Sequence, residues 1–200
     1  MRKVKDYYFR RAKEEGFLAR SIFKLEELNR KYRFINRGYK VLDLGSSPGS
    51  WSQYAVRVVS REGLVVGVDI QPMKLEPQKN LIFLQRDILS IDPEELRKIC
   101  PAFDVVLSDA APSTTGVKEA DAERSLELAR RALDIALAVL KPSGNFVAKV
   151  FQGEAFPAFL KDVKKKFGFA KASKPPASRP ESREMYVIGI GKIELEPLTE

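Results

Sequence analysis

KVLDLGSSPGSW, at residues 40–51, contains the transition on which the fold depends. An apolar run leads into a turn rich in glycine, serine and proline, and residues compatible with a helix begin at Ser50. A short apolar run that passes through such a turn into a helix is typical of alternating α/β folds. The stretch therefore predicts a strand over 40–45 and a helix over 50–60.

The same alternation continues along the chain. The further strands are expected over 64–69, 81–87, 103–109, 145–151 and 185–192, and the further helices over 17–31, 93–99, 119–140 and 154–167. Apolar strands that alternate with amphipathic helices predict a doubly wound, mostly parallel, Rossmann-like α/β sheet with helices on both faces.

The length of 200 residues fits one domain, residues 1–200. We divide it into a basic N-terminal helical segment (1–38), an α/β catalytic core (39–192) and an acidic tail (193–200). The charged start has no signal-peptide pattern, no run is long and apolar enough to span a bilayer, and the single cysteine excludes an intrachain disulfide. We therefore expect a cytoplasmic protein with no membrane partner, and a monomer.

The positive charge is concentrated near the N-terminus. Residues 1–40 hold 13 Lys or Arg against 5 Asp or Glu, a net +8, whereas the remaining 160 residues balance at 22 against 22. Within that remainder, residues 161–184 carry 8 basic and 3 acidic residues, a net +5. Such segregation favours a polyanion such as nucleic acid as partner, although a solvated basic surface without a partner is the competing interpretation.

Histidine is absent and Cys100 is the only cysteine. The usual general base and the usual metal ligands are therefore missing, and no metal is expected. The chemistry has to use Lys, Asp, Glu, Ser or Tyr, and Cys100 is interpreted as a small buried apolar residue.

Acidic residues stand at or near the ends of four successive predicted strands: Asp43, Asp69, Asp87 and Asp109. In open α/β sheets, ligands bind at the carboxyl ends of the strands, near the point where the strand order reverses. Each acid alone is compatible with a helix cap or a turn residue. The four together indicate a binding site.

The turn GSSPGS at 45–50 is neither a G-x-G-x-x-G fingerprint nor a P-loop. Asp43, directly before the turn, would repel the phosphates that such loops bind. A ligand with a sulfonium and an ammonium fits better. Asp69 is placed to accept both ribose hydroxyls of an adenosine, and Asp87 to accept the adenine amino group while Ile88 packs on the ring. Adenosine plus a cation, without phosphate, describes S-adenosyl-L-methionine.

Several motifs resemble those of the FtsJ/RrmJ family of 2′-O-ribose RNA methyltransferases. DLGSSPGSWSQ (43–53) resembles the family's cofactor loop, and its one departure is Ser50, where a second glycine is frequent. The other matching motifs are RSIFKL (20–25), SDAAP (108–112), AKVFQG (148–153), and KP (174–175) with SRPESREMY (178–186). They occur in family order over residues 17–190.

The resemblance implies a methyltransferase sheet, an activity that methylates the ribose 2′-hydroxyl of RNA, and S-adenosyl-L-methionine as cofactor. It implies four catalytic residues: Lys24, Asp109, Lys149 and Glu184. With the strand-end acids, the expected cofactor-binding residues are Asp43, Gly45, Pro48, Gly49, Trp51, Asp69, Ile70, Asp87, Ile88 and Asp109.

Of the four implied catalytic residues, Lys149 attracts attention without the resemblance, because it interrupts an apolar strand. A strand-end lysine that reaches solvent is the ordinary alternative. Without the resemblance, Glu184 would be interpreted as an ordinary exposed carboxylate. Lys24 would be interpreted as part of a solvated helix face. A 2′-hydroxyl must be aligned with the sulfonium and lose its proton. Lys149 can take that proton only in its neutral form, and the sequence leaves its charge state open.

The resemblance implies either a uridine of large-subunit ribosomal RNA or transfer RNA as the target. The short chain favours the ribosomal type, and transfer RNA stays the alternative. An RNA-binding ribosome-assembly factor with little turnover is the rival class. Tyr7, Tyr8 and Phe9, among basic residues, either stack on RNA or pack the first helix onto the core. The irregular stretch KPPASRP (174–180) is expected to form a mobile, RNA-facing loop.

Overall fold

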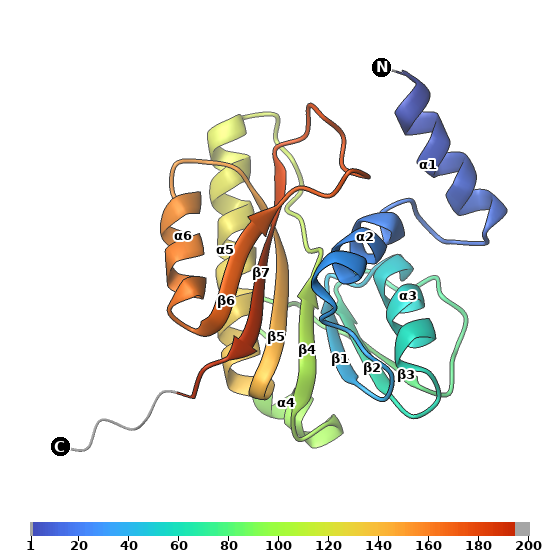
Figure 1. Cartoon of the computed structure of the whole chain (residues 1–200), viewed down its shortest axis with the longest axis vertical. Helices are drawn as coiled ribbons and strands as arrows, with labels where there is room; N and C mark the ends of the chain where they lie inside the picture. The colour runs from blue at the N-terminus through green and yellow to red at the C-terminus, as the bar shows by residue number, and fades with distance from the viewer. Residues whose placement is uncertain (1, 195–200) are drawn as a thin grey trace.

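The computed structural model describes residues 2–194, with the side chains of residues 2–6 left out, and contains a seven-stranded sheet in the order β3-β2-β1-β4-β5-β7-β6 (Figure 1). The strands are β1 (Lys40–Leu44), β2 (Leu64–Asp69), β3 (Leu81–Gln85), β4 (Phe103–Ser108), β5 (Leu140–Phe151), β6 (Phe167–Ser173) and β7 (Glu184–Lys192). β1 to β5 pair in parallel, whereas β7 runs antiparallel to both β5 and β6. The predicted doubly wound, mostly parallel sheet is confirmed.

Helices cover both faces of this sheet (Figure 1). They are α1 (Arg2–Glu14), α2 (Ile22–Tyr32), α3 (Ser50–Val59), α4 (Pro93–Ile99), α5 (Lys118–Val139) and α6 (Phe156–Lys164). α2 and α3 pack on one face, and α4, α5 and α6 on the other. No described helix is both long and apolar enough to cross a membrane.

The two-residue period of β1 explains how one strand serves both layers. Leu42 and Leu44 point into the core under α4 to α6, whereas Val41 points into the core under α2 and α3. Asp43 shares the parity of Val41, so its carboxylate points toward α3, where it meets Ser52. β1 pairs with β2 on one side and β4 on the other, so the strand order reverses at β1 and β4.

The structure differs from the expected elements in several places, among them β5, which begins at Leu140 and not at 145. The helix expected over 154–167 ends at Lys164, and residues 167–173 form the edge strand β6, which the sequence did not predict. β6 has no clear alternation of apolar residues, and it exists because it pairs with β7. The helix expected over 17–31 begins only at Ile22, after a turn at Gly16 with φ of +70°.

The segment 174–183 leaves β6, extends from the sheet toward α2 and returns to β7 (Figure 1). Hydrogen bonds within the segment and the burial of one of its side chains give it a defined conformation. The Lys174 ammonium donates to the carbonyl oxygens of Pro180 and Ser182 at 2.9 and 2.6 Å, and Ala177 is buried. The acidic tail predicted over 193–200 lies outside the described residues from position 195 onward.

Candidate active site

A cavity of about 380 Å³ lies at the carboxyl ends of β1 to β4. We call it the strand-end cavity. It is lined by residues that directly follow these strands, among them Gly45, Asp69, Ile70, Asp87, Ile88 and Asp109. The cavity therefore gathers six of the ten residues predicted to bind the cofactor. The reason is topological, because parallel neighbours end at one edge of the sheet.

Gly45 lines this cavity and allows two strand ends to approach each other there. Its φ of +75° is a conformation that side chains rarely adopt, and a Cβ there would lie 2.6 Å from the backbone of Ala110. The loop after β1 thus touches the segment after β4. A residue with a side chain would push these two strand ends apart and deform the space between them.

Asp69, the last residue of β2, lines the cavity. Its two carboxylate oxygens accept backbone N–H groups, one from Ser47 at 2.9 Å and one from Gln71 at 2.7 Å. The hydrogen bonds fix the carboxylate, and each oxygen keeps a further lone pair for a ligand. Ile70, the next residue, is largely exposed beside it.

Asp87 and Ile88 follow β3. The Asp87 carboxylate accepts the N–H of Leu89 at 2.9 Å, which is a local turn contact, and the side chain remains exposed at the cavity. Ile88 is buried and presents an apolar surface to the same cavity. The arrangement therefore offers one acceptor and one apolar surface side by side.

Asp43, Pro48, Gly49 and Trp51 do not line the strand-end cavity. Trp51 is buried in the core, where its indole N–H donates to the carbonyl of Ser21 at 3.0 Å and its ring packs against Tyr186. Gly49 adopts φ of +117° at the start of α3. Contact between these four residues and a cofactor therefore stays a prediction, whereas the other six predicted residues lie together in the cavity lining.

Asp43 is fully buried, and its Oδ2 accepts the hydroxyl of Ser52 at 2.6 Å. Its Oδ1 has no hydrogen-bond partner among the described residues. Burial raises the pKa of Asp43 to about 7; the Ser52 hydrogen bond works against the rise, and the charges of Asp109 and Asp69 add to it. A cationic ligand nearby would stabilise the charged form of this carboxyl group.

The four catalytic residues implied by the resemblance form two ion pairs, and one of the four, Asp109, also lines the strand-end cavity. In the first pair, the Lys24 ammonium of α2 lies 2.6 Å from the Glu184 carboxylate at the start of β7. Lys24 is only 7% exposed, so the solvated helix face expected from the helical wheel is wrong. Although burial acts to raise it, the pKa of Glu184 is lowered, because the Lys24 ammonium, and more weakly that of Lys149, favours the carboxylate.

In the second pair, the Lys149 ammonium of β5 lies 3.0 Å from Asp109 Oδ1 and donates to the Asp109 carbonyl at 2.5 Å. Lys149 is 6% exposed, so it is not a strand-end lysine that reaches solvent. Asp109 belongs both to this pair and to the lining of the strand-end cavity.

Tyr186 is a site residue that the sequence reasoning missed. It is fully buried opposite Lys149 in the β5–β7 ladder, and its hydroxyl donates to Asp109 Oδ1 at 3.0 Å. Burial and the Asp109 charge raise its pKa well above the usual range, so the hydroxyl stays protonated. In sequence it looks like one more β-strand aromatic, and only its pairing with Lys149 distinguishes it.

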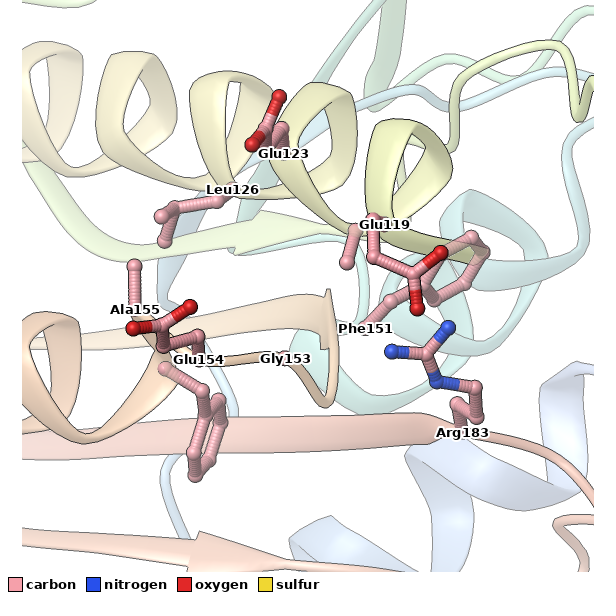
Figure 2. Close-up of a pocket in the computed structure, with 10 residues that line it drawn as sticks. Glu119, Glu123, Leu126, Phe151, Gly153, Glu154, Ala155 and Arg183 are labelled. Atoms are coloured by element: carbon pink, nitrogen blue, oxygen red, sulfur yellow. The ribbon is translucent and has the colours of Figure 1, made fainter. Parts of the chain in front are cut away.

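A second cavity, of about 610 Å³, opens between α5 and α6 beyond the end of β5 (Figure 2). Glu119, Glu123 and Glu154 surround it, together with Arg183. The Arg183 guanidinium donates to the carbonyls of Lys118 and Gln152 at 2.9 and 2.5 Å. None of the residues predicted from the sequence for the site lines this cavity.

The chemistry of the strand-end cavity fits the cofactor inferred from the sequence. Its lining includes three carboxylates, Asp69, Asp87 and Asp109, and no Lys or Arg. Such a lining disfavours a phosphate and suits a ligand with hydroxyls, an amino group and a positive charge. Asp109 belongs both to the cavity lining and to the ion pair with Lys149, so the two sites share one side chain.

Comparison with known proteins gives consistent matches. The family model described as FtsJ-like methyltransferase matches residues 17–192. The chain is 49% identical over 188 residues to the ribosomal RNA large subunit methyltransferase E of Desulfatibacillum aliphaticivorans, with 94% of this chain and 91% of that protein covered. It is 44% identical over 191 residues to the protein of the same name from Bdellovibrio bacteriovorus, with coverage of 94% and 97%. A crystal structure of a ribosomal RNA methyltransferase from Plasmodium falciparum superimposes with a TM-score of 0.79 at 27% identity, covering 88% of this chain and 98% of that chain.

Proposed function

Because the chain belongs to the FtsJ-like methyltransferase family, we propose that it transfers a methyl group from S-adenosyl-L-methionine to a ribose 2′-hydroxyl of RNA, at a uridine of large-subunit ribosomal RNA. The choice of RNA is supported by the relatives at 44% and 49% identity, whose names specify the large ribosomal subunit.

One observation carries the proposal. Asp109 lines the strand-end cavity and at the same time holds Lys149 Nζ at 3.0 Å. The candidate cofactor cavity and the candidate proton acceptor are therefore joined by a single side chain. Methyl transfer needs this adjacency, because the acceptor oxygen has to lie in line with the donor and lose its proton at the same place.

The bound cofactor would supply the electrophilic methyl group on its sulfonium. On the protein side, Asp69 would accept the ribose hydroxyls of the adenosine, with Ile70 beside it, and Asp87 and Ile88 would hold the adenine. Asp43, Pro48, Gly49 and Trp51 would act by shaping the loop after β1.

Lys149 Nζ is the proposed acceptor of the 2′-hydroxyl proton, and it must be neutral at that moment. Asp109 orients it through the carboxylate and the main-chain carbonyl, at 3.0 and 2.5 Å. Lys24 and Glu184 form the opposite pair, and Glu184 stays ionised because its pKa is lowered. It can therefore accept a hydrogen bond from the substrate hydroxyl and align it.

The test is incubation of the chain with methyl-labelled S-adenosyl-L-methionine and either unmodified large-subunit ribosomal RNA or transfer RNA, followed by nucleoside mapping. Label in a 2′-O-methyluridine of the ribosomal RNA is the expected result. Label confined to transfer RNA would overturn the choice of substrate. Binding of RNA without label in either would favour an assembly factor with little turnover.

A further inference from the structure

Glu27 of α2 connects two segments that are far apart in the sequence. Its Oε1 accepts the hydroxyl of Tyr8 in α1 at 2.9 Å, and its Oε2 accepts the backbone N–H of Ala177 at 2.9 Å. One carboxylate thus holds the N-terminal helix with one oxygen and the segment 174–183 with the other. Hydrogen bonds to a carboxylate are stronger than those between neutral groups.

The packing around Glu27 joins the same three elements. Ala12 of α1, Ile22 and Phe23 of α2, and Ala177 form one buried apolar cluster, with Tyr8 packed against it. The rings of Tyr8 and Phe23 lie 5.4 Å apart. Burial, together with the Glu27 carboxylate, raises the pKa of Tyr8 to about 12, so its hydroxyl remains a donor at neutral pH.

The segment that leads into β7 is tied to α2 at two points. Glu27 binds Ala177, and Lys24, one turn earlier on the same helix, binds Glu184 at 2.6 Å. Residues three positions apart on a helix lie on one face, so the two contacts are in line. The position of Ala177 and the position of the candidate catalytic Glu184 are therefore both set from α2.

We propose that Glu27 is a positioning residue for RNA methylation, which aligns α1 and the segment 174–183 with the Lys24–Glu184 pair as one RNA-facing unit. The inference rests on the proposed function, since it concerns the same reaction. Among the described residues, the Glu27 carboxylate accepts hydrogen bonds from Tyr8 and Ala177 and forms no ion pair with either candidate catalytic lysine.

Charge on the two aligned segments indicates why their alignment concerns RNA. Arg179 follows Ala177 by two residues. Burial, and then the charge of Arg179, lowers the pKa of Arg20, which lies between α1 and α2, whereas the carboxylates of Glu184 and Glu181 act in the opposite direction. The positive charge of Arg179 thus acts on Arg20, and the Glu184 carboxylate of the ion pair acts on it with the opposite sign. An RNA phosphate would relieve the repulsion between the two arginines. α1 adds the largely exposed rings of Tyr7 and Phe9, which suit stacking on unpaired bases.

If the role of Glu27 were only structural, its replacement would lower the stability of the fold and would not raise KM for RNA more than it lowers kcat. Three variants distinguish the two roles. Glu27→Ala removes both hydrogen bonds. Glu27→Gln can keep both, because its amide oxygen can accept from Ala177 while its NH₂ donates to the Tyr8 oxygen. Tyr8→Phe cuts only the bond to α1. Glu62→Ala is the matched control, because Glu62 is an exposed glutamate paired with Arg37 and distant from the site in the fold.

Steady-state methylation of the RNA that the wild-type chain modifies gives the main readout, at a temperature where all variants are folded. We expect Glu27→Ala to raise KM for RNA about tenfold with a smaller change in kcat and an unchanged KM for the cofactor. Glu27→Gln should stay within about twofold of wild type. Tyr8→Phe should show part of the loss of Glu27→Ala, and Glu62→Ala should behave as wild type.

Equal KM values for RNA in Glu27→Ala and Glu62→Ala would overturn the inference, and so would a Glu27→Gln variant as impaired as Glu27→Ala. A wild-type chain that methylates no RNA would instead overturn the proposed function. In that case backbone amide hydrogen exchange still tests whether Glu27 connects α1 to residues 174–183. Glu27→Ala must then speed exchange in both segments, and Glu27→Gln must not. Exchange unchanged in either segment would refute it.

Discussion

Lys149 is held in a buried position by two oxygens of one residue, the carboxylate and the carbonyl of Asp109. We expect Lys149→Ala to abolish methyl transfer, because it removes the proposed proton acceptor, and to leave cofactor affinity near normal, because Lys149 does not line the strand-end cavity. An activity assay with calorimetric titration of S-adenosyl-L-methionine measures both, and Lys98→Ala, at an exposed lysine of α4, is the control. Retained turnover would remove Lys149 from the mechanism.

Asp69 is the carboxylate of the cavity whose geometry is best defined, since two backbone N–H groups hold it. Asp69→Ala should weaken cofactor binding by about 1.5–3 kcal/mol, the usual contribution of hydrogen bonds to a charged group. Calorimetry gives the dissociation constant, with Asp134→Ala on the exposed face of α5 as the control. An unchanged dissociation constant would contradict the ribose assignment.

Asp43 makes the stability of the fold depend on pH. Its pKa rises from 3.8 to about 7 on folding because the group is buried. Because the raised pKa favours the protonated acid in the folded state, Asp43 contributes most to the free energy of unfolding below pH about 4. This contribution, roughly 4 kcal/mol, is lost as pH rises through about 7. Asp43→Asn should flatten this decline, measured by urea unfolding between pH 4.5 and 8 relative to Asp134→Asn. Parallel curves for wild type and Asp43→Asn would show that Asp43 does not titrate in this range.

At the scale of elements, the loop after β1 and the segment after β4 can approach only because Gly45 has no side chain. Gly45→Ala places a Cβ 2.6 Å from Ala110 and strains a φ of +75°. Gly191→Ala has almost the same φ, +70°, and no atom of the described residues lies within 4 Å of the new Cβ. We expect a loss of about 1–2 kcal/mol for Gly191→Ala, from backbone strain alone, and about 3 kcal/mol or more for Gly45→Ala. Denaturant unfolding measures both, and similar losses would mean that the contact with Ala110 relaxes.

α1 shows how the structure divides a group of residues that the sequence treats as one. Tyr8 packs on Phe23 and binds Glu27, whereas Tyr7 and Phe9 are largely exposed. Arg11 lies 4.3 Å over the Phe23 ring and pairs with Glu15, so it stabilises the helix contact. Packing on the core is therefore confirmed for Tyr8, and stacking on RNA stays a prediction for Tyr7 and Phe9.

At the scale of the whole molecule, basic residues near the N-terminus and in residues 161–184 flank a balanced middle. If α1 contacts RNA, Arg10→Ala with Lys13→Ala should weaken RNA binding and flatten the dependence of log K on log salt by about 0.7–0.9 per lost phosphate contact. Arg11 is left in place because of its contact with Phe23. RNA binding over a salt series, with cofactor affinity as the control, measures this. If the variant kept the slope and the affinity of wild type, these residues would form a solvated face that does not contact RNA.

The sequence by itself determined the parallel part of the sheet, the strand-end acids and the family. These follow from local signals, namely apolar runs of strand length, turn residues and short motifs such as the loop at 43–53. The strand-end site follows as well, because in a parallel sheet the order of elements sets which ends meet. Lys24 and Glu184 were available only through the resemblance, since nothing local marks either residue.

Only the tertiary structure decided the contacts between distant segments. Lys24 and Glu184 are 160 residues apart, and Glu27 and Ala177 are 150 apart. Tyr186 acquires its role from its place opposite Lys149 in the β5–β7 ladder, and β6 exists as a strand because β7 offers it an edge. A sequence pattern reports which face of an element is apolar. Which partner that face meets depends on how helices and strands pack in three dimensions, and the partner decides whether a charged side chain is solvated or buried in an ion pair.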